Sequence, residues 1–392
     1  MVTLGYIEPV DEDFATETFP SKVGGKPRWL DPTRPLDAAQ VSCEECKKPM
    51  VLLMQLYAPE DEPPSAFHRT LYLFVCRNGG CHRTSPKRCM RVFRAQMGEI
   101  NDVYEEVLAS GIVEEGEEGE DDVEWVVRQG VAAKAACVVC GLAGNSTCSS
   151  CKGRRYCSRA HQLADWDAGH RTQCGKAAAD NAVHRRKLQR MLFPEHVIVS
   201  EAEPAEAATE DALAAEDSDD DAEDREGIEA SDMALVPAGQ GEAVEDSQVD
   251  VDRAFLMFQQ RVQACPDQVL RYAREPGCDE VAPPLYVSDE GCPEAGVDVP
   301  ACEACGLARE FEMQVMPQML NFLGIDAAEP SSIDWGTLLV YSCPHSCTSD
   351  AAYVREVVCR QNFSSQGIGE KYVRAMHGDD SGIVRQIDAL QI

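Results

Sequence analysis

The chain has 392 residues, enough for two or three domains, and a formal net charge of −32 from 68 acidic and 36 basic residues. This balance argues against direct binding of nucleic acid or anionic membranes, and it favours basic partners. The N-terminal residues MVTLGYIEPVDEDF lack the apolar core of an export signal, and no apolar run approaches the length of a membrane span. We therefore expect a cytoplasmic and nuclear protein whose nineteen cysteines stay reduced.

Cysteines in the N-terminal stretch, residues 1–110, have the spacing of a zinc ribbon. A CxxC pair is followed by an apolar strand, LYLFVC, which ends in a cysteine, and a fourth cysteine follows five residues later. Two cysteine pairs held at strand ends can close one tetrahedral zinc site. The predicted ligands are Cys43, Cys46, Cys76 and Cys81. Reduced core cysteines are the alternative interpretation, and His82 beside them could replace one ligand.

The densest set of ligand-type residues lies in 131–176. Eight cysteines and histidines there suffice for two tetrahedral zinc sites, and a disulfide framework would need neither histidine. Their spacing alone allows either sequential or interleaved pairing. The set is Cys137, Cys140, Cys148, Cys151, Cys157, His161, His170 and Cys174.

Two acidic stretches flank this set. The first, EEGEEGEDDVE, lies in an acidic linker at 111–130, and the second spans 201–249. Residues 201–250 hold nineteen Asp and Glu against the single base Arg225, with almost no aromatic or β-branched residues. Such a segment cannot bury enough apolar surface to offset the entropy of ordering, so we expect 201–249 to be disordered. The sequence HRRKLQR predicts a basic helix between the set and this segment, at 177–200.

The C-terminal stretch, residues 250–392, repeats the motif order of the N-terminal one. In both, a CxxC pair is followed at the same offset by Met-Gln, then by a cysteine-ended apolar strand, and then by a strand with a late glutamine. Such a repeat predicts two related β lobes with one zinc site each. The ligands predicted for the C-terminal lobe are Cys302, Cys305, Cys343 and Cys347. His345 could replace one of them, and apolar residues from Phe255 to Val262 predict an amphipathic helix before the lobe.

The remaining motifs do not indicate an enzyme. The sequence has no P-loop, no Gly-x-Ser-x-Gly elbow and no cofactor-binding glycine loop, and Gly24-Gly25-Lys26 lacks the spacing of a phosphate loop. The proposed zinc sites are fully ligated, which leaves no position for a catalytic water. The cysteines outside the zinc sets are expected to be ordinary thiols: Cys89, Cys265, Cys278, Cys292 and Cys359.

The central set resembles a MYND zinc finger in its alternating pairs and its final His-x3-Cys. The resemblance implies a cross-brace, in which the two zinc ions take interleaved ligands. It assigns one ion to Cys137, Cys140, Cys157 and His161, and the other to Cys148, Cys151, His170 and Cys174.

Most of the chain resembles the programmed cell death protein 2 family. The motifs that carry the resemblance are LGYIEP, SKVGGKPRWLDP, FHRTLYLFVCRNGGC and IDWGTLLVYSCPHSC. The family implies a dedicated chaperone for a small-subunit ribosomal protein of universal class S-five, acting in biogenesis of the 40S subunit. Some members lack the finger, which implies an accessory role for it. A MYND-type adaptor in transcription or apoptosis is the alternative function.

The expected fold is therefore mainly β (α+β), with two related zinc-containing lobes, an inserted MYND-type finger and an acidic disordered segment. We expect a monomer that holds two zinc ions in the finger and one in each lobe. Two lobes facing each other would form a cleft whose sheet edges bind an extended segment of the basic client by strand addition. Trp29 and Trp335 would be apolar anchors there, unless each is ordinary lobe core.

Overall fold

A computed structural model gives the fold of the chain. It describes residues 2–11, 14, 16–84, 86–108, 123–176, 182–204, 252–274, 281–326, 329, 332–348 and 351–363. Most of the predicted acidic linker and of the predicted disordered segment at 201–249 lies outside the described residues. None of the helices in the described ranges is long and apolar enough to cross a membrane.

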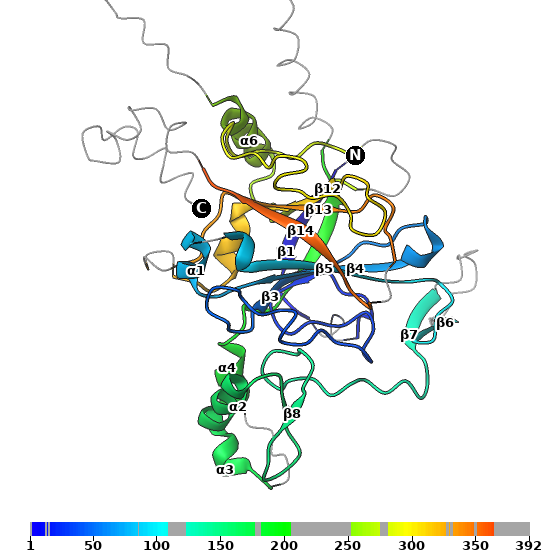
Figure 1. The fold of residues 1–392 in the computed structure, drawn as a ribbon, viewed down its shortest axis with the longest axis vertical. Helices are drawn as coiled ribbons and strands as arrows, with labels where there is room; N and C mark the ends of the chain where they lie inside the picture. The colour runs from blue at the N-terminus through cyan, green and yellow to red at the C-terminus, as the bar shows by residue number, and fades with distance from the viewer. Residues whose placement is uncertain are drawn as a thin grey trace, which may run out of the picture.

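Ten antiparallel strands from both ends of the chain form one closed β-barrel (Figure 1). Around the barrel their order is β1 (Thr3–Glu8), β10 (His196–Ala202), β2 (Lys22–Val23), β3 (Val51–Tyr57), β4 (His68–Val75), β5 (Met90–Met97), β14 (Val354–Gln361), β13 (Thr337–Ser342), β12 (Glu310–Val315) and β11 (Leu270–Tyr272). One hydrophobic core draws residues from strands of both halves. The expected two separate lobes are therefore wrong, because a shared core and continuous strand pairing merge them.

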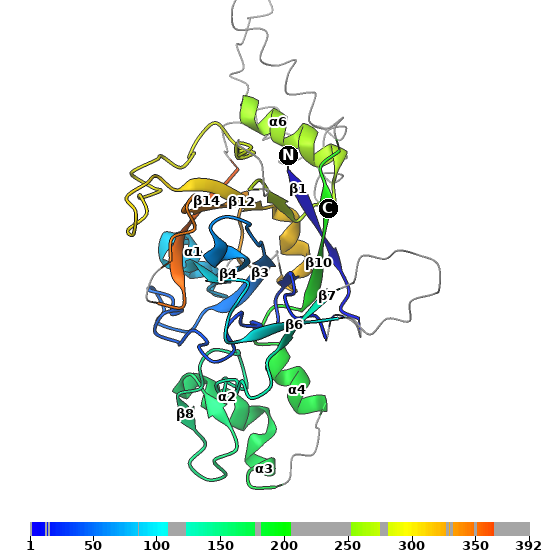
Figure 2. The same ribbon diagram turned by 90° about the vertical axis from the view of Figure 1, so that its right-hand side faces the viewer.

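Shorter elements connect and cover the barrel. They are η2 (Pro64–Ala66), α1 (Gly79–Thr84), η3 (Pro86–Arg88), β6 (Tyr104–Leu108), β7 (Val123–Val127), β8 (Ser146–Thr147), β9 (Arg155–Tyr156), α2 (Arg159–Asp165), η4 (Trp166–His170), α3 (Arg171–Gln173), α4 (Ala182–Gln189), α6 (Arg253–Ala264) and η5 (Pro317–Phe322). The α2–α4 region lies at one end of the barrel and α6 at the other, in both views (Figures 1 and 2).

The internal repeat is present in the strand pairing. Met54 of β3 lies opposite Leu73 of β4, and Met313 of β12 lies opposite Val340 of β13, at equivalent positions of the two copies. A bulge immediately precedes each of these methionines. Because bulges are specific local features of a strand pair, their recurrence at one repeat position confirms the duplicated β topology.

The late glutamines of the repeat are not structurally equivalent. Tyr72 lies opposite Phe93, but its counterpart Leu339 lies opposite Cys359, one residue later than the repeat predicts. A one-residue shift turns side chains to the other face of a sheet. Accordingly Gln361 is buried and bonds the backbone of the 287–290 loop, whereas Gln96 reaches the backbone oxygen of Ser346.

Strands β1 and β10 close the barrel between the two halves. Strand β1 pairs with β11 of the C-terminal half, β10 pairs with β2 of the N-terminal half, and β1 and β10 pair with each other. Gly5 permits the close approach, since a Cβ there would lie 2.9 Å from the Cβ of Leu270 and 3.0 Å from Ile198 Cγ2. On the other side of the barrel β5 pairs with β14.

This closure corrects the expected client cleft. The sheet edges that were predicted to accept a client strand are paired with each other at β5–β14 and at β1–β11. Barrel closure removes exposed edges, which would otherwise promote aggregation. Trp335 is 1% exposed and belongs to the core, and Trp29 packs against the same core, so neither lines a cleft between lobes.

Ion pairs inside the barrel join the halves. Arg69 of β4 donates two hydrogen bonds to the Glu312 carboxylate of β12, at 2.5 and 2.7 Å, and both side chains are fully buried. Burial alone would raise the pKa of Glu312, but Arg69 outweighs it and holds that pKa at about 2. Across the β5–β14 seam, Arg94 donates to Glu356 at 2.9 Å, again with both side chains buried.

Strand β10 was not expected. In the described part of the predicted basic helix at 177–200, Ala182–Gln189 form α4, whereas residues 196–202 form β10. Its apolar run Val197–Val199 favours a strand, and Ile198 is buried between its neighbours. The amphipathic helix predicted before the C-terminal lobe is confirmed as α6, which Asp252 caps and Phe258 anchors.

Candidate metal centres

Four compact clusters of cysteine and histidine side chains exist among the described residues, and they coincide with the four predicted ligand sets. In each cluster the possible ligand atoms all lie within 4.8 Å of one another. Zinc–sulfur bonds of about 2.3 Å in a tetrahedron would place the sulfurs about 3.8 Å apart. The measured sulfur–sulfur distances below are close to that value and far from a disulfide bond.

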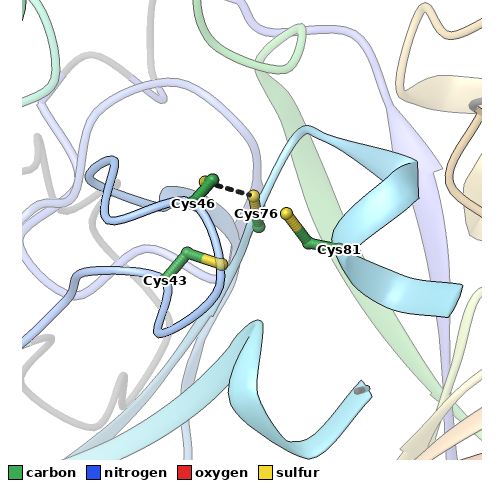
Figure 3. A group of neighbouring side chains, drawn as sticks. All are labelled: Cys43, Cys46, Cys76 and Cys81. Atoms are coloured by element: carbon green, nitrogen blue, oxygen red, sulfur yellow. Dashed lines mark hydrogen bonds between the residues drawn. The ribbon is translucent and has the colours of Figure 1, made fainter. Parts of the chain in front are cut away.

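The N-terminal barrel site consists of Cys43, Cys46, Cys76 and Cys81 (Figure 3). The first two lie in the turn before β3, Cys76 directly follows β4, and Cys81 lies in α1. The Sγ atoms of Cys46 and Cys76 are 3.6 Å apart. His82 is not part of this cluster, because its Nε2 bonds the backbone oxygen of Cys76 at 2.6 Å.

The C-terminal barrel site is built in the same way. It consists of Cys302, Cys305, Cys343 and Cys347. Cys343 directly follows β13, and its Sγ lies 3.6 Å from the Sγ atoms of both Cys305 and Cys347. His345 is exposed and outside the cluster. Cys305 is also exposed, which leaves this site more open to solvent than the N-terminal one.

The finger has the interleaved arrangement that the MYND resemblance implies. One cluster is Cys137, Cys140, Cys157 and His161, and the other is Cys148, Cys151, His170 and Cys174. In the first, the Sγ atoms of Cys140 and Cys157 are 3.5 Å apart. In the second, those of Cys148 and Cys174 are 3.8 Å apart. Local structure presents the histidines, since Ser158 caps α2 at the amide of His161 and Gly169, at φ 149°, turns the chain before His170.

Backbone amides favour the thiolate form of the first cysteine in two knuckles. The pKa of Cys148 is lowered to about 6, and the hydrogen bond from the Cys151 amide is the largest cause, ahead of the one from His170. At Cys302 burial opposes ionisation, but the Cys305 and Ala304 amides outweigh it and lower the pKa to about 7. Since zinc binds thiolate rather than thiol, these turns are prepared for metal.

The finger is attached to the barrel through its first knuckle. The indole of Trp29 donates to the backbone oxygen of Gly141 at 2.9 Å, and Lys26 donates to that of Val138 at 2.8 Å. Val139 and Leu142 of the same knuckle are fully buried. The knuckle is thus part of the barrel's outer packing, a role that sequence spacing could not show.

The remaining cysteines form no further cluster in the described ranges. Cys89, Cys265 and Cys359 are buried, and Cys292 is exposed. Cys278 lies outside the described residues. These positions fit the ordinary thiols that the sequence predicts.

We predict about four zinc ions per chain, one for each cluster, because each supplies four ligands at tetrahedral spacing. Elemental analysis of the purified protein measures the number. The Cys148→Ser variant should lower it by one, and Cys292→Ser, outside every cluster, should not change it. A count of two would mean that the barrel clusters do not hold zinc.

Comparison with known proteins identifies the family. The model of the programmed cell death protein 2 N-terminal domain matches residues 1–109, that of its C-terminal putative domain matches 252–362, and a MYND finger model matches 137–174. Programmed cell death protein 2 of Rattus norvegicus is 35% identical over 93% of this chain and 97% of its own length. The Bos taurus protein is 36% identical over 92% and 96%.

A shorter similarity concerns a protein of Schizosaccharomyces pombe. The probable 20S rRNA accumulation protein 4 is 32% identical over 28% of this chain and 27% of its own length. No solved structure matches the chain. The domain models and the full-length relatives agree, and the chain therefore belongs to the programmed cell death protein 2 family.

Proposed function

We propose that the protein is a zinc-binding dedicated chaperone for a basic small-subunit ribosomal protein, of universal class S-five, in the making of the 40S subunit. The observation that carries the proposal is the similarity to an S. pombe protein named for 20S rRNA accumulation, within a chain that has both family domains. A ribosomal protein that is not assembled leaves rRNA processing incomplete. A chaperone of such a protein would act without catalysis, in cytoplasm and nucleus, as a monomer.

The charge of the chain supports this proposal. Ribosomal proteins are strongly basic, and a protein with net charge −32 attracts them through complementary potential. Since the barrel leaves no free sheet edge at the joins between its halves, we place client contacts on the outer surface and the acidic segments rather than on an added strand.

Isolation of the protein from translating cells tests the client. We expect one basic small-subunit ribosomal protein in near-equal amount, retained after ribonuclease treatment, because a dedicated chaperone holds its client outside the ribosome. Recovery of many ribosomal proteins that disappear with ribonuclease would indicate ribosome contamination and contradict the proposal.

Deletion of 205–250 is expected to slow client capture at low ionic strength and to change it little at high salt. The deletion spares β10, which ends at Ala202, and removes a segment with seventeen Asp and Glu against one Arg. At 0.1 M salt, attraction between exposed charges more than about 10 Å apart is largely screened. Association rates over a salt series measure the effect. Loss of capture at every salt concentration would instead place specific recognition in the segment.

A variant of the second finger cluster, which contains Cys148 and Cys151, distinguishes the adaptor function from the chaperone function. Removing all of 131–176 would also strip the knuckle that packs on Trp29 and disturb the barrel. The double variant Cys148→Ser/Cys151→Ser disrupts only the cluster farther along the finger. An adaptor that uses the finger would lose its partners in this variant, whereas the chaperone would keep its client.

A further inference from the structure

Basic residues are concentrated in one part of this acidic chain. Residues 134–190, which comprise the finger and α4, contain eleven Lys and Arg but only three Asp and Glu. One of the three, Asp165, is fully buried and bonded to Tyr156, His184 and Arg154. It therefore contributes little negative potential to the surface, and the finger end of the molecule is strongly positive.

Helix α4 presents its positive charges outward. The side of α4 that packs against the protein carries His184 and Leu188, which are one helical turn apart and both buried. Arg186, Lys187 and Arg190 are exposed on its remaining circumference. In the described part of the chain none of the three forms an ion pair with a side-chain carboxylate.

The orientation of α4 is fixed by the finger. His184 Nε2 lies 2.7 Å from Asp165 Oδ1, and His184 Nδ1 lies 3.2 Å from Gln173 Oε1 at the end of α3. Two further exposed bases, Arg171 and Lys176, lie within three residues of Gln173. We name the surface of Arg171, Lys176, Arg186, Lys187 and Arg190 the α3–α4 face.

We propose that the α3–α4 face binds RNA through its phosphate backbone. The face is a held array of guanidinium and ammonium groups, which neutralise phosphates and release their counterions. The bonds of His184 hold α4 against the finger, so the backbone that carries these charges is in place before binding. Phosphate contacts of this kind carry no sequence information, and binding at this face is expected to depend on salt rather than on base identity.

The described residues on either side of the acidic segment lie at the other end of the molecule from the α3–α4 face, and we therefore take an external polyanion rather than the chain's own carboxylates as its occupant. Strand β10 leads away from α4, and Glu203 at its far side pairs with Arg261 of α6 at 2.8 Å. The residues on both sides of the segment, 204 and 252, thus adjoin the α6 end of the barrel, whereas α3 and α4 lie at the other end (Figure 2). The proposal differs from the expectation drawn from net charge alone, which was no direct contact with nucleic acid.

The test uses the full chain without client and a fluorescent single-stranded RNA, over a salt series. We expect Arg186→Gln/Lys187→Gln/Arg190→Gln to weaken binding about tenfold or more at low salt. It should also reduce the slope of log affinity against log salt by about 2, since each phosphate contact on a single strand contributes about 0.7. The matched control, Arg83→Gln/Arg253→Gln/Arg355→Gln, removes the same charge from exposed barrel positions and should bind as the parent does.

Three outcomes would overturn the proposal. The first is that the α4 variant binds RNA as the parent does, and the second is that the control variant loses as much affinity. The third is RNA binding that appears only after deletion of 205–250, which would make that segment the occupant of the face. Zinc content and circular dichroism of both variants verify folding. Client capture, measured separately on the α4 variant, is expected to be unchanged, so a failure here leaves the chaperone proposal standing.

Discussion

Replacement of Cys305 by serine is expected to unfold the whole barrel rather than its C-terminal half alone. The variant removes one ligand of the C-terminal site, and zinc binding in structural sites supplies on the order of 10 kcal/mol of folding free energy. The loop from Cys343 to Cys347 is also held by the other half, since Arg94 donates to the Cys347 oxygen at 2.9 Å and Gln96 to the Ser346 oxygen at 2.8 Å.

Hydrogen exchange resolves the two halves in this experiment. The amides of β3 and β4 should lose protection together with those of β12 and β13, because one core and two strand seams join them. The Cys292→Ser variant, at an exposed cysteine outside every cluster, is the control and should exchange like the parent. Retained protection of β3 and β4 in Cys305→Ser would show that the halves fold independently after all.

Loss of one partner of the Arg69–Glu312 pair is expected to cost about 3–5 kcal/mol of unfolding free energy, because the remaining buried charge loses its bidentate partner. Only weaker partners then remain, Glu60 at 3.4 Å for Arg69 and Arg274 for Glu312. The Arg69→Met and Glu312→Gln variants should each show this loss in urea unfolding at pH 7. The double variant Arg69→Met/Glu312→Met should recover most of the stability, since it removes both desolvated charges and keeps similar volume.

The exposed pair of Arg88 and Glu44 supplies the control for this prediction. The two side chains are 49% and 42% exposed, so solvent screens their attraction and Arg88→Met should change stability little. If the double variant at Arg69 and Glu312 were as unstable as the single ones, lost packing rather than an unpaired charge would be the cause.

The candidate sites were largely predictable from sequence because their ligands come in short, local pairs. One turn holds the first pair of each barrel site, before β3 or β12. The second pair follows the next strand along the chain, β4 or β13. The repeat also predicted the order of these strands along both halves of the chain, although not the bulge that both copies share. Whether each cluster holds zinc stays a prediction for elemental analysis.

Barrel closure could not be predicted in this way. It depends on pairings such as Arg94 with Val354, whose partners lie far apart in the chain and leave no periodic trace. The signals that did exist were polar residues in apolar strands. Arg69 and Glu312 lie in apolar strands, where burial of a single unpaired charge would be costly. Two opposite charges in such positions therefore indicate that the side chains contact each other in a shared interior.

The pairing of β1 with β10 and β11 affects the order in which the chain can fold during its synthesis. Strand β1 is translated before both of its neighbours in the barrel, β10 and β11, which end at Ala202 and Tyr272. Until those residues leave the ribosome, the nascent N-terminus has no partner, although Cys43 to Cys81 are already available to bind zinc. The N-terminal metal site can therefore form during translation before the barrel closes, and a chain that stops before β10 would expose the unpaired strand to chaperones and proteases.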